Sequence, residues 1–154
     1  MIKYTRKNHR DTAKLPERVK TNKPKRTKWK KRLWDAYSAY IRKRDGYTCK
    51  FHERIREKGI SSPCVCNGVM QACHKVRRGE IFIDDRNVFC GCSGSNLWSK
   101  MNEVKWNELW HKLWPEDVDY LEKQARIVRH YDAWTCKVLI DEYKRRTDGL
   151  EYGA

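Results

Sequence analysis

Apolar residues are distributed unevenly along the chain, and the first segment has almost none in a regular pattern. From Met1 to about Arg26 the sequence consists mainly of lysine, arginine, asparagine and threonine, with Pro16 and Pro24. Such a segment has too little apolar surface to offset the entropy that ordering would cost. We therefore predict a flexible basic arm over residues 1–26.

Helical periodicity begins near Thr27, a residue type that can cap a helix N-terminus. The apolar positions then recur every three or four residues until Asp45-Gly46, a pair that favours a turn. They are Trp29, Leu33, Ala36, Tyr37, Tyr40 and Ile41. This pattern predicts a helix whose apolar stripe packs on the core.

Residues 46–97 differ in character, because glycines and six of the seven cysteines fall within them. Their regular runs are short and favour strands, at residues 80–83 and 87–89. A segment of this kind cannot build a large core, so it usually needs a metal ion to hold it together.

The last third of the chain is predicted to be helical. A helix over residues 98–114 places Trp106, Trp110 and Trp114 on one face, with leucines between them. The leucines favour a buried stripe over one that stacks on bases or forms a homodimer face, although a homodimer stays open. Pro115 can open another helix through residue 125, and Thr135 can cap a last helix to about Arg146. The whole pattern predicts one α+β domain over residues 27–147 and a short tail over 148–154.

The charge of the chain points to a polyanionic partner. Lysine and arginine total 35 against 20 acidic residues, which gives a net charge of +15. The first 32 residues carry 14 of these cations and only Asp11 and Glu17 as acids. Nucleic acid is therefore the first candidate partner. The arm residues Lys23, Lys25 and Arg26, together with Lys28 just after the arm, are expected to contact phosphates.

Membrane insertion and secretion are not expected. The longest purely aliphatic run, Val138-Leu139-Ile140, is far shorter than the roughly 20 apolar residues that a membrane span needs. The N-terminus carries charges where a signal peptide has an apolar stretch. We expect a cytoplasmic protein whose seven cysteines are reduced and available to metals.

Two cysteine pairs are candidates for a structural zinc site. Cys64-Val65-Cys66 and Cys90-Gly91-Cys92 each lie in a turn-like context, and four thiolates from two turns can form a closed tetrahedral site. Cys49 and His52 are alternates for two of the four places. Small buried hydrophobic residues are the other interpretation of these cysteines, and Cys136 is expected to be one.

The order His74, Asn87, Asn96 suggests phosphodiester chemistry. Hydrolysis needs a base that activates water, a cation that stabilises developing charge, and a rigid frame that aligns them. His74 can be the base and Asn96 a ligand of the cation, while Asn87 can fix the hairpin that carries His74. An incidental or structural histidine is the alternative.

The segments 72–79, 82–88 and 92–96 resemble the phage NinG/Rap recombination endonucleases, which belong to the HNH (His-Me finger) nucleases. The motifs are Ala-Cys-His-Lys-Val-Arg-Arg-Gly, then Phe-Ile-Asp-Asp-Arg-Asn-Val, then Cys92 with Asn96. Flanking residues resemble the family as well, at 40–45, 134–135 and 142–143, so the likeness spans about residues 33–146.

The resemblance implies a site and a fold. His74 would be the general base, Asn87 the central asparagine, and Asn96 a ligand of a catalytic Mg²⁺ or Mn²⁺. Arg78 and Arg86 match family arginines that meet phosphate. The second protein ligand of the catalytic ion is unassigned, with Asp84 and Asp85 as candidates. The implied fold is a zinc-stapled ββα centre flanked by helices.

We therefore expect a metal-dependent DNA endonuclease, and the resemblance implies branched recombination intermediates as its substrates. One alternative is an HNH homing or nicking endonuclease that acts on duplex DNA. The other is a zinc-stabilised nucleic-acid-binding module without catalysis, which would have no need of the His74, Asn87, Asn96 order.

Overall fold

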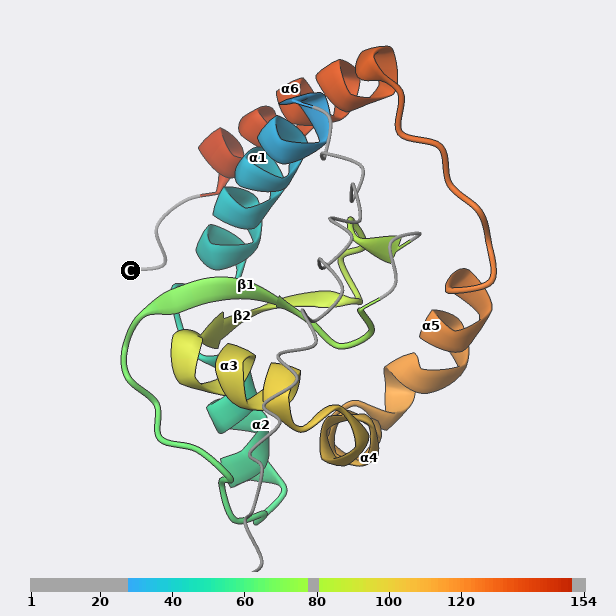
Figure 1. Cartoon of the computed structure of the whole chain (residues 1–154). Helices are drawn as coiled ribbons and strands as arrows, with labels where there is room; N and C mark the ends of the chain where they lie inside the picture. Colours follow the sequence, from blue (N-terminus) through green and yellow to red (C-terminus); the bar gives the residue numbers. More distant parts are fainter. Residues whose placement is uncertain (1–27, 78–80, 151–154) are drawn as a thin grey trace, which may run out of the picture.

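The computed structural model describes residues 28–77 and 81–150 as helices around a small antiparallel sheet (Figure 1). Over these residues the order is α1 (Lys28–Arg44), α2 (Lys50–Glu57), β1 (Met70–His74), β2 (Val88–Cys92), α3 (Ser93–Met101), α4 (Glu103–Leu113), the 3₁₀ turn η2 (Pro115–Asp117), α5 (Val118–Gln124) and α6 (Ala133–Gly149). The expected α+β class is confirmed. The predicted arm and its residues Lys23, Lys25 and Arg26 lie outside the described residues, as do Thr27 and Arg78.

The two-stranded sheet separates two apolar cores. On one side α1 and α6 lie together and bury residues such as Tyr37, Ile41 and Tyr143 against Val88 of β2. On the other side α2, α3, α4 and α5 enclose a second core. Its buried residues include Phe51, Phe89, Trp106, Trp110 and Trp114. The three tryptophans are thus buried as predicted.

The helical predictions need two corrections. The segment 98–114 forms two helices, because Asn102 adopts a non-helical conformation and its side-chain amide donates to the Trp98 carbonyl oxygen at 3.0 Å. An asparagine that binds the backbone in this way competes with helix continuation. The last helix begins earlier than predicted, since Asp132 rather than Thr135 is its N-cap. It also runs to Gly149, beyond the predicted start of the tail.

The strand prediction at residues 80–83 is wrong for the described part of that run. Ile81, Phe82 and Ile83 are buried outside the sheet, and β2 instead pairs with residues 70–74, in the register Ala72 opposite Cys90. Burial of these apolar side chains does not require ladder hydrogen bonds. Helix α2 was not predicted. Its apolar residues Phe51 and Ile55 stand at helical spacing and are both buried, but a segment of eight residues is too short for that spacing to be distinctive.

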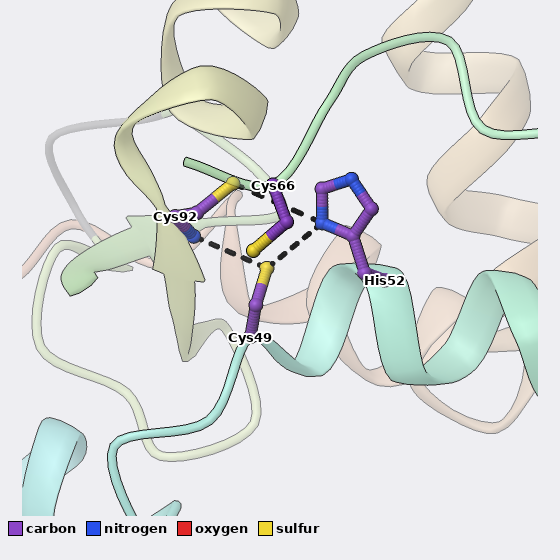
Figure 2. Close-up of side chains that lie close together, drawn as sticks. All are labelled: Cys49, His52, Cys66 and Cys92. Atoms are coloured by element: carbon purple, nitrogen blue, oxygen red, sulfur yellow. Dashed lines mark hydrogen bonds between the residues drawn. The ribbon is translucent and has the colours of Figure 1, made fainter. Parts of the chain in front are cut away.

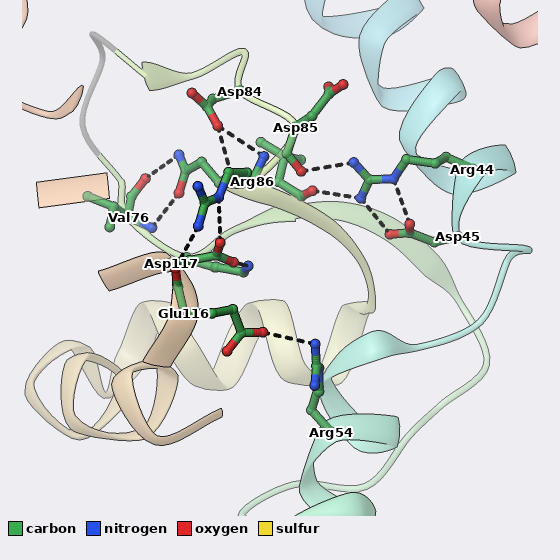
Figure 3. Close-up of polar contacts among 12 residues, drawn as sticks. Arg44, Asp45, Arg54, Val76, Asp84, Asp85, Arg86, Glu116 and Asp117 are labelled. Atoms are coloured by element: carbon green, nitrogen blue, oxygen red, sulfur yellow. Dashed lines mark hydrogen bonds and ion pairs between the residues drawn. The ribbon is translucent and has the colours of Figure 1, made fainter. Parts of the chain in front are cut away.

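The outer edge of β2 is closed by side chains of α1 and the residue that follows it (Figure 3). Arg44 donates to the Val88 carbonyl oxygen at 3.0 Å, and the Asp45 carboxylate accepts the Cys90 N–H at 2.7 Å. These contacts replace the hydrogen bonds that another strand would make. Within the described part of the chain, no helix is both long and apolar enough to cross a membrane.

Candidate metal centre and candidate active site

Four side chains from three separate segments meet on the α2 side of the sheet (Figure 2). Cys49 and His52 come from the start of α2, Cys66 from the loop before β1, and Cys92 from the junction of β2 and α3. Their ligand atoms all lie within 4.8 Å of one another. Three thiols and an imidazole form a donor set that zinc prefers in closed structural sites, so this cluster could hold such an ion.

The orientation of His52 suits a metal ligand. Its Nδ1 lies 3.1 Å from Cys49 Sγ and 3.8 Å from Cys92 Sγ, while its Nε2 lies 2.9 Å from the Cys64 carbonyl oxygen. A carbonyl can only accept, so Nε2 carries the proton and Nδ1 presents its lone pair to the thiols. Metal-bound histidines are usually fixed through the second nitrogen in this way.

The backbone around the cluster favours negative sulfur. Cys92 is the N-cap of α3, and its sulfur accepts the Ser95 N–H at 3.3 Å. Burial raises the pKa of Cys92, but hydrogen bonds with Ser95, Asn67 and Cys49 together outweigh it and bring the pKa below its usual value. The Cys92 N–H donates to Cys49 Sγ at 3.2 Å, although burial still raises the pKa of Cys49 to about 11. A divalent cation would reverse that rise, because thiolates are the form that binds metal.

The predicted zinc ligands are therefore partly corrected. Cys66 and Cys92 of the expected set lie in the cluster, and the alternates Cys49 and His52 complete it; Cys64 and Cys90 lie outside it. Cys90 is inside the extended strand β2, where positions two residues apart are separated by about 6.6 Å, rather than in a turn. The Cys64 carbonyl oxygen contacts His52 Nε2, and the Cys64 thiol lies 3.9 Å from that same nitrogen, on the side of the ring away from the cluster's Nδ1.

Gly94 allows the loop that carries Cys66 to approach α3. A Cβ atom at this position would lie 2.7 Å from the Val65 carbonyl oxygen, a distance that such contacts essentially never show. The absence of a side chain at Gly94 thus helps to bring Cys66 beside Cys92.

His74 is the last residue of β1, and Phe82 and Trp34 contact its ring. Its Nε2 lies 3.0 Å from the Phe82 carbonyl oxygen, and the ring stacks on Trp34 of α1 at 4.8 Å with an angle of 14°. Because the carbonyl accepts, the proton of a neutral His74 resides on Nε2, and Nδ1 is the basic nitrogen.

Asn87 closes the loop between the two strands. It is fully buried, and its amide donates to the carbonyl oxygens of Val76 and Ile81, both at 2.9 Å. Its Oδ1 accepts the Val76 N–H at 2.8 Å. All of these bonds go to backbone on the two arms of the loop, so Asn87 fixes the loop that follows His74 rather than contacting a substrate.

Asn96 lies one turn after Cys92 on α3, and its amide is oriented by β1. Its Nδ2 donates to Gln71 Oε1 at 2.7 Å, while Oδ1 has no protein partner among the described residues. That oxygen is a neutral, hard donor of the kind Mg²⁺ accepts.

His74 and Asn96 line the same cavity, which has a volume of about 490 Å³. One wall is α1, with Trp34, Ser38 and Arg42; the other includes α3, with Asn96 and Lys100. Arg77 also lines the cavity, and among the described residues around it there is no carboxylate. The cavity is thus cationic and suits an anion such as phosphate.

Three other predicted residues lie away from this cavity. Arg86 donates to Asp117 at 2.6 Å and to the Glu116 carbonyl oxygen, so its guanidinium is engaged elsewhere (Figure 3). Asp84 accepts the N–H groups of Arg86 and Asn87, and Asp85 contacts Arg146 and Tyr40. Neither aspartate lines the cavity, which leaves them unsuited as the second ligand of an ion bound there.

Sequence reasoning missed most of the cavity wall. Trp34, Ser38 and Arg42 recur at four-residue spacing on α1, so a signal for one continuous face existed. Nothing in the sequence indicated that this face lies opposite α3, because that depends on how α1 packs across the sheet.

Comparison with known proteins gave no match, either to a protein-family model, to a curated protein or to a solved structure.

Proposed function

We propose that the chain is a metal-dependent endonuclease of the HNH type that hydrolyses phosphodiester bonds in DNA. The observation that carries the proposal is one arrangement: His74 at the end of β1 and Asn96 on the helix after β2 line a single cationic cavity. Asn87, between them in sequence, locks the connecting loop.

The residues of the cavity can divide the chemistry among them. His74 Nδ1 is the base that takes a proton from the attacking water, and the Phe82 carbonyl with the Trp34 ring keeps the imidazole in place. Arg42, Arg77 and Lys100 attract the phosphate groups of the substrate without selecting a base sequence.

The ligand atoms of the cavity suit an ion whose remaining ligands are supplied by the substrate. Asn96 Oδ1 would be a protein ligand, and since no carboxylate is among the described residues of the cavity, phosphate and water oxygens would supply the others. When bound, Mg²⁺ or Mn²⁺ would stabilise the charge that develops on the phosphate and the leaving oxygen. The thiol-rich centre would hold zinc in a structural role.

Cleavage by the His74→Ala variant tests the proposal. Wild type, His74→Ala and the control His111→Ala, an exposed histidine on α4, would be incubated with four-way junction, flap and linear duplex DNA, with and without Mg²⁺. Loss of a general base costs about a hundred- to ten-thousandfold in rate, while binding should change little. His111→Ala should cleave like wild type.

The remaining outcomes separate the alternatives. Preference for junction and flap over linear duplex supports a branched substrate, while cleavage of linear duplex at defined sequences favours a homing or nicking enzyme. Tight binding without cleavage of any substrate would show a zinc-stabilised binding module instead. An equal loss of binding and cleavage in His74→Ala would make His74 a structural residue.

A further inference from the structure

Helices α1 and α6 begin at the same end of the molecule. Trp29 of α1 lies next to Lys137 of α6, and fourteen residues further along α1, Lys43 donates to the Thr147 carbonyl oxygen at 2.7 Å. The two helices therefore run side by side in the same direction (Figure 1). Their first turns form one surface, which we call the basic–aromatic end; it comprises Lys28, Trp29, Lys30, Arg32, Trp134 and Lys137.

Trp134 is the most unusual residue of this end, because its large apolar side chain is exposed. All seven tryptophans lie in the described part of the chain, and only Trp134 is largely exposed, at 72%. Lys137 follows Trp134 less than one turn later on α6. Lys137 lies over the Trp29 ring at 4.8 Å, and Arg32 lies over the same ring at 5.1 Å. Among the nearby acids, Asp35 pairs with Lys31 and Asp132 caps α6, while Asp141, about one turn after Lys137, lines the same groove as Trp29 and Lys137.

The sequence that precedes Lys28 is strongly basic. Residues 1–27 contain ten lysines and arginines against Asp11 and Glu17, and they join the structure at the first turn of α1. A polyanion is therefore the partner whose charge matches this surface.

We propose that the basic–aromatic end binds single-stranded nucleic acid, with a base stacked on Trp134 and phosphates on the neighbouring cations. Cations alone would hold duplex and single strands alike, because phosphate contacts carry no information about pairing. An exposed indole discriminates, since the faces of unpaired bases are open for stacking whereas those within a duplex are covered.

A chain of contacts connects this end with the cavity that holds His74. Lys30 lies 6.0 Å from the Tyr131 ring, Tyr131 packs edge-on against Phe82 at 4.7 Å, and Phe82 lines the cavity. A single strand held at the basic–aromatic end can thus extend toward His74. The binding itself does not depend on the proposed cleavage, so it can be measured without it.

Binding of a labelled oligothymidylate and of a blunt duplex of the same length tests the inference, by fluorescence anisotropy without added Mg²⁺. Stacking of one base is worth about 1–3 kcal/mol, so Trp134→Ala should weaken oligothymidylate binding about tenfold and leave duplex binding nearly unchanged. Trp134→Phe should keep most of the affinity. Met101→Ala, which removes an equally exposed apolar side chain from α3, should change neither.

Substitution of the cations gives a second readout. Lys137→Gln should lower the slope of log affinity against log salt by about 0.7 on the single strand, whereas Lys144→Gln, two turns further along α6, should not. Circular dichroism of each variant would confirm that it folds. Trp134→Ala should not weaken α6, because alanine has a higher helix propensity than tryptophan.

Three results would overturn the inference. They are no oligothymidylate binding by wild type, equal weakening of both ligands by Trp134→Ala, and unchanged binding in that variant. A wild-type dimer that Trp134→Ala converts to a monomer would likewise overturn it, because the ring would then face a second copy of the chain. Since cleavage is not measured, none of these results bears on the proposed nuclease activity.

Discussion

The metal centre and the cavity share one short segment of chain but differ in nearly every physical respect. Cys92 begins α3 and belongs to the thiol cluster, while Asn96, one turn later, faces the cavity. The cluster is closed, and three of its four side chains are buried, with donors that suit zinc. The cavity is lined by cations and amides, with no carboxylate among its described residues.

Under the proposed function, this difference lets one helix serve two ions. The thiol cluster can bind a cation without any partner, because its ligands complete a tetrahedral site. The cavity repels free cations and attracts phosphate, so a catalytic ion would enter it with the substrate. Zinc at Cys92 would then fix the start of α3, and thereby Asn96, before DNA arrives.

Of the substitutions considered, one in the loop before β1 should have the largest effect, because it should abolish metal binding at the thiol cluster. Cys66→Ser should release the metal and strongly lower thermal stability, because metal-binding energy in a closed site is also folding energy. Cys64→Ser, two residues earlier, should keep the metal, since the Cys64 thiol lies outside the cluster of ligand atoms and its carbonyl oxygen is retained in the variant. Metal content by mass spectrometry and thermal unfolding of both variants would show the difference. Equal metal loss from both would mean that Cys64 Sγ is a ligand.

Asn87→Ala should disturb the loop that follows His74, and with it the cavity, while leaving the metal centre intact. The substitution leaves one backbone N–H and two carbonyl oxygens without their partner, at about 1–3 kcal/mol each where water cannot reach them. We expect a loss of about 3–5 kcal/mol in unfolding free energy, a marked loss of cleavage, and unchanged zinc content. Denaturant unfolding and metal analysis measure both. Zinc loss in this variant would show that the two sites are not independent.

Asp117 tests how the hairpin is anchored to η2. It bonds to buried Lys75 and to half-exposed Arg86, and removal of one partner from a buried ion pair costs about 3–5 kcal/mol. Because Arg86 is open to solvent, we expect about 3 kcal/mol for Asp117→Asn.

The cost of Asp117→Asn should depend on pH. Burial raises the pKa of Asp117, but Lys75 and Arg86 lower it further, so the folded value lies below the unfolded one. The stabilisation is therefore full above about pH 4 and is lost as the pH falls through the folded pKa. Urea unfolding across pH should show the two proteins converging in acid; a constant difference would contradict the ion pair.

Gly94→Ala should have the smallest effect. The added methyl group meets the Val65 carbonyl oxygen, so the loop with Cys66 must shift, at about 1–2 kcal/mol. Gly149→Ala is the matched control, because nothing lies within 4 Å of a Cβ there. Zinc affinity from competition with a chelating dye should fall only for Gly94→Ala, and an unchanged affinity would place the loop further from α3.

The sequence predicted those features that depend on local periodicity. Trp106, Trp110 and Trp114 are buried because a stripe at helical spacing must face a core. The single helix predicted over residues 98–114 is nevertheless two helices, since Asn102 hydrogen-bonds to the Trp98 carbonyl oxygen and interrupts it. Local pattern indicates burial well, but it gives the ends of elements poorly.

The metal ligands could be predicted only in part. The spacing correctly predicts Cys66 and Cys92, but it favours Cys90 over Cys49 because Cys90-Gly91-Cys92 resembles a turn. Cys90 lies in the extended strand β2 and outside the cluster, and the packing of α2 against β2 brings distant Cys49 and His52 to Cys92 instead. The spacing of cysteines along the sequence does not reveal long-range contacts of this kind. The catalytic roles of His74 and Asn96 stay predictions.

Metal analysis combined with a cleavage assay tests the central claim that the two sites hold different ions for different purposes. The protein would be passed through gel filtration in EDTA, analysed for zinc, and assayed on junction DNA before and after addition of Mg²⁺ or Mn²⁺. The account predicts about one zinc retained per chain, as a closed site would hold it, with cleavage absent until Mg²⁺ or Mn²⁺ returns. A zinc-free protein that is still folded, or cleavage that needs no added ion, would contradict it.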